Sequence, residues 1–114
     1  MLSINGTTIH LTQGDTFDAE IDLKIEKDGY SSKYVPEEGD SIRFAIKSSY
    51  KSEEPIILKE IPTDTMRLRL ESEETKLLKA KAVPYVYDIE LTRADGTVVT
   101  FICEAEWYST NEVH

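Results

Sequence analysis

The sequence predicts an all-β domain in which two antiparallel sheets pack face to face. Apolar and polar residues alternate in one segment after another, turn signals recur every ~8–12 residues, and a single short stretch departs from this period. A chain of 114 residues fits one domain spanning residues 1–114. Because 39% of its residues are hydrophobic, this domain can bury a core without disulfides or a metal.

Four segments show the alternation most clearly. The first runs from Phe17 to Ile25, with apolar side chains at the odd positions and charged ones between them. The others cover residues 42–46, 66–70 and 85–91. A period of two places one face of a strand in a core and the other in water. We therefore expect a strand in each segment.

Weaker strand signals lie between these segments. Residues 2–4 and 8–11 flank Asn5-Gly6, which favours a two-residue hairpin turn. Residues 56–61 are expected to form a short strand that ends before Pro62. Together with the four clear segments and the end of the chain, they bring the expected total to about seven to nine strands.

The last third of the chain contains the clearest hairpin signal, Asp95-Gly96. Residues 97–104 follow it and are apolar at nearly every position, which is typical of a strand covered on both faces or lying near an edge partner. A final short strand is expected to include Trp107 and Tyr108.

One stretch, residues 72–79, does not alternate. Ser72 can cap a helix there, and Glu73 and Glu74 suit the positive end of a helix dipole. We expect one short helical turn, too short to be stable alone, that closes one end of the sandwich.

The charges on the expected outward faces predict how the strands pair. In an immunoglobulin-like order the second strand lies beside the fifth, and the third beside the sixth. The outward residues of each pair are opposite in sign: Asp18, Glu20 and Asp22 against Arg67 and Arg69, and Arg43 and Lys47 against Asp88 and Glu90. Each cross-strand pair contributes only about 0.2–1 kcal/mol, so the pairs select register more than they stabilise. Tyr85 or Tyr87 could form a tyrosine corner near the helical turn.

The charge of the chain limits its partners. With 22 acidic and 13 basic residues, the net charge is −9. Such a surface repels phosphate groups, and no run of lysine or arginine offsets this, so neither nucleic acid nor a membrane is expected as a partner. The first six residues lack the charged and apolar regions of a secretory signal. We expect synthesis in the cytoplasm without export by a signal peptide.

Residues suited to catalysis are scarce. His10 is expected to project outward from a strand, and His114 is the last residue; neither has metal-ligand spacing. Cys103 has no activating histidine nearby in the sequence and is expected to be a buried thiol. The acidic face at 18–22 could hold Ca²⁺, but pairing with Arg67 and Arg69 is the simpler alternative. We expect no enzyme, no cofactor and no metal site.

Aromatic residues in the expected loops and near the end of the chain are the candidate partner contacts: Tyr30, Tyr34, Tyr50, Trp107 and Tyr108. The first three lie in loops expected at 28–36 and 48–55, and the other two near the end of the chain. Exposed aromatic side chains often anchor interfaces. The alternative is that they cover the loop bases and the open end of the sandwich.

Four segments of the chain together resemble a known group of proteins: residues 9–17, 38–47, 84–92 and 95–97. They resemble short proteins encoded in phages and prophages of Gram-positive gut bacteria. These are similar to the N-terminal, immunoglobulin-like domain of the phage baseplate upper protein. The turn at 14–16 and the Tyr-x-Tyr strand are the most distinctive parts of the match.

The resemblance implies a non-catalytic structural or adaptor component of a phage or prophage virion, in a tail, a baseplate or a head. Its partners would be other virion or assembly proteins, with a homo-oligomer as a further option, and its final location would be the phage particle. The alternative function is a small ligand- or carbohydrate-binding sandwich that uses the loop aromatics. Gathering of those aromatics on one surface would favour the alternative, and scattering would count against it.

Overall fold

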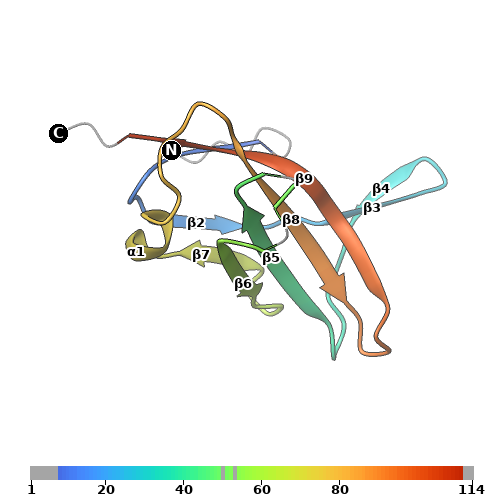
Figure 1. Ribbon diagram of the computed structural model, residues 1–114. Helices are drawn as coiled ribbons and strands as arrows, with labels where there is room; N and C mark the ends of the chain where they lie inside the picture. The colour runs from blue at the N-terminus through green and yellow to red at the C-terminus, as the bar shows by residue number, and fades with distance from the viewer. Residues whose placement is uncertain (1–7, 50, 53, 112–114) are drawn as a thin grey trace.

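The computed structural model describes residues 8–49, 51–52 and 54–111, with all their side chains except those of 25–27, 31 and 102–104. They form an all-β sandwich (Figure 1). A five-stranded sheet has the order β1-β9-β8-β5-β6, β2 and β7 form a small second sheet, and β3 and β4 pair with each other. The strands are β1 Ile9–Thr12, β2 Phe17–Glu20, β3 Lys24–Lys27, β4 Tyr30–Lys33, β5 Ser41–Lys47, β6 Ile57–Ile61, β7 Arg67–Leu70, β8 Tyr85–Thr92 and β9 Val98–Thr110.

The strand pairing predicted from the charges is confirmed. In the antiparallel β2–β7 pair, Asp18 lies opposite Arg69. Its carboxylate binds Arg67 at 2.9 Å and Arg69 at 3.2 Å. In the antiparallel β5–β8 pair, Arg43 lies opposite Glu90. These two neighbour relations are those of an immunoglobulin-like sandwich.

The single strand expected from Phe17 to Ile25 is wrong, because the chain changes partner halfway. The Ile21 N–H still donates to the Met66 carbonyl at 2.7 Å, on the side of β7. Two residues later the Leu23 carbonyl accepts the Tyr34 N–H at 2.7 Å, on the side of β4. Burial alternates without interruption through this point, so the period of two did not reveal the change.

The loop expected over 28–36 is also wrong, because it contains β4. Asp28 and Gly29 have φ angles of 53° and 81°. They connect Lys27 to Tyr30, which lie opposite each other in the ladder. Positive φ at both central residues defines the two-residue turn that suits the twist of a hairpin. The Asp-Gly dipeptide was the sequence signal for this turn.

The expected strands at 97–104 and around Trp107 form one strand of 13 residues, β9. It follows the Asp95-Gly96 hairpin, which is confirmed: the Arg93 N–H donates to the Thr97 carbonyl at 2.8 Å. Val98, the first residue of β9, is 53% exposed, so the alternative in which this segment is covered on both faces is wrong there. β1 pairs with β9 in parallel, so the sheet is not purely antiparallel. The expected Asn5-Gly6 turn lies outside the described residues.

Trp107 is the centre of the core and is 1% exposed. Its ring centroid lies 5.1 Å from that of Phe17 on β2, 6.1 Å from Phe44 on β5 and 6.3 Å from Tyr87 on β8. Tilted and edge-on rings at such distances attract each other in addition to burying apolar area. One side chain from β9 therefore joins three strands of the large sheet to the small sheet.

The helical turn is present but shorter than expected: α1 spans Ser72–Thr75, and its N-cap is Glu71 rather than Ser72. The Ser72 hydroxyl instead donates to the Gly14 carbonyl at 2.6 Å, and the Thr75 hydroxyl to the Asp15 carbonyl at 2.7 Å. These bonds hold α1 against the turn between β1 and β2, so the helical turn closes one end of the sandwich as predicted. No helix among the described residues is long and apolar enough to cross a membrane.

The expected tyrosine corner is formed by Tyr85. Its hydroxyl donates to the Lys79 carbonyl at 2.7 Å, just after the helical turn. The Lys81 ammonium lies 4.1 Å from the centre of the Tyr85 ring, a cation–π contact on the outer side. The corner fixes the path of the chain from α1 into β8.

Replacing the central side chain should make the protein less stable. We expect Trp107→Ala to lower the free energy of unfolding by about 3–5 kcal/mol, because it removes a buried aromatic side chain and leaves a cavity between the sheets. Val98→Ala on the same strand removes an exposed side chain and should change it by about 0.5 kcal/mol or less. Urea denaturation of both variants measures this difference. Equal losses would show that Trp107 is not the centre of the core.

Candidate protein interface

The β3–β4 hairpin lies outside both packed sheets. Among the described strands, β3 and β4 pair only with each other. Figure 1 shows the hairpin extending away from the body of the molecule on the right of the view. A two-stranded hairpin is only marginally stable alone in water. Its order therefore depends on how firmly its base is held.

The base of the hairpin is part of the core. Leu23 and Tyr34, which bracket the hairpin, are 2% and 7% exposed. The Tyr34 ring packs against Phe101 of β9 with centroids 5.4 Å apart. Its hydroxyl donates a hydrogen bond to the Asp40 carboxylate. The two residues where the hairpin leaves the body are thus fixed by packing and by a side-chain hydrogen bond.

The Tyr34–Asp40 pair has a clear electrostatic character. Burial, together with donation to a carboxylate, raises the pKa of Tyr34 to about 12. The hydrogen bond from Tyr34, and a second one from the Glu37 N–H at 2.9 Å, hold the pKa of Asp40 below its usual value. A protonated phenol and an ionised carboxylate therefore persist over the whole neutral range.

Ion pairs engage the acidic face formed by Asp18, Glu20 and Asp22, for which a calcium site was one of the two alternatives. Asp18 is engaged by the two arginines of β7. Lys33 of the hairpin lies 3.7 Å from Glu20 and 3.3 Å from Asp22. No group of three or more metal-ligating residues occurs within the described parts of the chain. The paired, solvated face is the arrangement that the structure contains.

At the tip of the hairpin, Tyr30 is 80% exposed, more than any other large hydrophobic residue that the structure describes. It follows the Asp28-Gly29 turn directly and begins β4. Tyr30 is one of the five aromatic residues predicted as partner contacts. The structure places it where a partner could reach its ring.

A second exposed area adjoins the hairpin, in the loop from β4 to β5. Val35 is 72% exposed, and Glu37 and Glu38 are exposed beside it. This loop passes close to Ala94: a Cβ on Gly39, whose φ is 90°, would lie 2.6 Å from the Cβ of Ala94. We call Val35, Glu37 and Glu38 the acidic end.

Of the other predicted aromatic contacts, the three that the structure describes do not gather with Tyr30. Tyr34 and Trp107 are buried in the core, so these two pack inside the domain instead of being exposed to a partner. Tyr108 stacks on His10 with centroids 4.7 Å apart, and Tyr50 lies outside the described residues. The C-terminal end of β9 and the hairpin lie at opposite ends of the molecule (Figure 1). This scattering counts against a carbohydrate site built from the loop aromatics.

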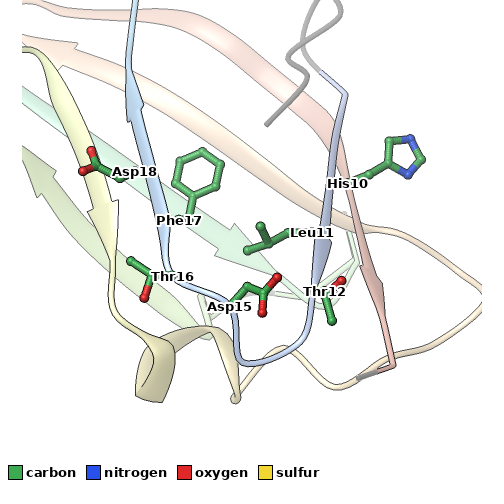
Figure 2. Close-up of a pocket in the computed structure, with 7 residues that line it drawn as sticks. All are labelled: His10, Leu11, Thr12, Asp15, Thr16, Phe17 and Asp18. Atoms are coloured by element: carbon green, nitrogen blue, oxygen red, sulfur yellow. The ribbon is translucent and has the colours of Figure 1, made fainter. Parts of the chain in front are cut away.

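A hollow of about 340 Å³ lies between β1 and β2 and was not predicted. Figure 2 shows Leu11 and Phe17 between the two strands, whereas the His10 ring points away from them. His10 is exposed, as predicted, and packs on Tyr108 rather than on a carboxylate of the hollow. The lining residues are His10, Leu11, Thr12, Asp15, Thr16, Phe17 and Asp18. Nothing in this arrangement pairs a base with a nucleophile.

Two residues considered for catalysis cannot be placed. His114 and the side chain of Cys103 lie outside the described part of the structure, so the expected buried thiol stays a prediction. No family model matches the chain, and no curated protein is significantly similar to it. The surface is therefore interpreted from its own geometry and charge.

The Tyr34–Asp40 bond predicts a specific pH dependence. Because folding lowers the pKa of Asp40, the stability it contributes is present above its usual pKa of 3.8 and is lost as the pH falls through the lower, folded value. Asp40→Asn should therefore reduce the free energy of unfolding more at about pH 7 than at about pH 2. Urea denaturation at both pH values measures the difference. Glu54→Gln, at an exposed residue outside this loop, should leave it near wild type, and an Asp40→Asn effect independent of pH would contradict the assignment.

Proposed function

We propose that this chain is a non-catalytic structural or adaptor component of a phage or prophage particle, in a tail, a baseplate or a head, and that it acts through protein–protein contacts. The β3–β4 hairpin carries the proposal. Its base is held by Leu23 and Tyr34, yet its strands pair with no other described strand. Ordering an exposed hairpin costs conformational entropy that its own contacts barely offset. A hairpin of this kind is suited to contact with another protein.

The edge of the large sheet supports the same proposal. β6 pairs with β5 on one side and with no strand of the described chain on the other. Leu58 of β6 is 56% exposed, and Ile56, the residue that precedes this strand, is 37% exposed. The Lys59 ammonium is held by Glu74 at 2.9 Å, which keeps a charge at this edge. An edge strand with apolar side chains is a natural docking site, and a lysine there limits indiscriminate pairing.

The assignment to a phage particle is supported by the resemblance of the sequence. The segments that carry it coincide with the β1–β2 turn, β5 and β8. With a net charge of −9, the protein would be repelled by packaged DNA, so we propose a place among other proteins. In a symmetric particle many weak contacts of this kind add up. The chain would be made in the cytoplasm and then incorporated into the virion.

Purified particles test this proposal directly. In a lysogen whose genome encodes this chain, prophage induction followed by density-gradient purification should recover the chain with the particles. Quantitative mass spectrometry should find it in a fixed ratio to the main structural proteins across the particle fractions. A fixed ratio is expected because symmetric assemblies have a defined copy number.

The control is a cytoplasmic enzyme of the host, which should stay at the top of the gradient. Recovery of the chain with that enzyme, and not with the particles, would contradict the proposed function.

A further inference from the structure

The hairpin differs in charge from the rest of the protein. Residues 24–33 contain three lysines, one glutamate and one aspartate, a net charge of +1. Since the whole chain has a net charge of −9, the remainder carries −10. The projecting element is therefore weakly basic on a strongly acidic molecule, and an acidic surface such as that of another copy would complement its charge.

One lysine of the hairpin has an unfavourable environment in the single chain. Lys24 lies directly opposite Lys33 in the β3–β4 ladder. Like charges in this position destabilise a sheet. Glu20 and Asp22 neutralise Lys33, whereas exposed Lys24 forms no ion pair with any described residue. An acidic group from outside the chain would relieve the repulsion.

The acidic end offers such a group next to an apolar contact. Neither Glu37 nor Glu38 forms an ion pair with a residue that the structure describes, and Val35 beside them is 72% exposed. The hairpin and the loop from β4 to β5 are consecutive in the chain, and both lie on the right of the view in Figure 1. Donor and acceptor surfaces are thus neighbours on one side of the molecule.

We propose that the hairpin docks on a second copy of this chain, related by a two-fold axis. Tyr30 of each copy, at the tip of the hairpin, packs on Val35 of the other. Lys24, which the ladder register places on the opposite face of the hairpin, faces Glu38 of the other. A two-fold axis uses one self-complementary patch twice, so adjacent donor and acceptor surfaces satisfy both copies at once. This inference rests on the proposed function, because it takes the hairpin to be the contact element and names its partner.

Sedimentation equilibrium of the whole chain tests the inference. The wild-type protein should form a dimer in a concentration-dependent way. Tyr30→Ser and Lys24→Glu should each raise the dimer dissociation constant about tenfold or more, since each removes a central contact. Lys51→Glu makes the same change of charge outside the hairpin and should leave the constant within about twofold of wild type. Circular dichroism confirms that each variant is folded.

A charge exchange makes the test specific. Lys24→Glu alone brings two carboxylates together, and Glu38→Lys alone brings two ammonium groups together, so each should dimerise poorly. Mixed in equal amounts, they should form a heterodimer in which both contacts again join opposite charges. Its dissociation constant should return to within about threefold of wild type.

A wild-type chain that stays monomeric up to about 1 mM, or an oligomer that the hairpin variants do not weaken, would overturn the inference. So would a mixture of the two charge variants that fails to associate while both are folded. These results would leave the proposed function intact if the chain still purifies with particles, in which case the hairpin contacts a different virion protein.

Discussion

The burial of Trp107 between the two sheets is the constraint on which the rest of the structure depends. Its ring contacts Phe17 on the small sheet and Phe44 and Tyr87 on the large one. To bring this residue inside, β9 must take a fixed register between β1 and β8, with Ile9 and Tyr85 as direct neighbours of Trp107. The inner face of three strands is therefore set by one side chain.

The hairpin is defined by where this core ends. Leu23 and Tyr34 are buried core residues, and beyond them the chain has only its own ladder to pair with. The Asp28-Gly29 turn and the Tyr34–Asp40 bond keep the hairpin in one place. The packing of Leu23 and Tyr34 in the core thus holds a hairpin that itself contributes little to the core. This division between a rigid core and an exposed arm is the physical basis of the proposed contact function.

Much of the fold could be predicted because its determinants are local. The alternation of apolar and polar residues located most of the strands. Opposite charges on their outward faces identified two pairs of neighbouring strands, β2 with β7 and β5 with β8, as the Asp18–Arg69 pair shows. The change of partner after Ile21 could not be predicted, since alternation reports which face is buried but not which strand lies alongside. An aromatic residue near the end of a chain, such as Trp107, likewise gives no local sign of whether it is buried.

The candidate interface was only partly predictable. Tyr30 was predicted as a contact and is exposed, but its partners in the proposed interface, Lys24 and the acidic end, were not recognised. Their significance depends on the hairpin formed at Asp28-Gly29, where a loop was predicted. Once the hairpin is known, the like-charged neighbours Lys24 and Lys33 follow from the register. Surface function here depends on tertiary pairing that no short segment encodes.

Hydrogen–deuterium exchange tests the central claim, that the hairpin is a contact arm on a rigid core. The amides of β3 and β4 should exchange quickly in the isolated monomer and should become protected in the assembled state, whether dimer or particle. The amides of β5 and β8, which lie inside the large sheet, should be protected to the same extent in both states. Hairpin amides that exchange at the same rate before and after assembly would contradict the account.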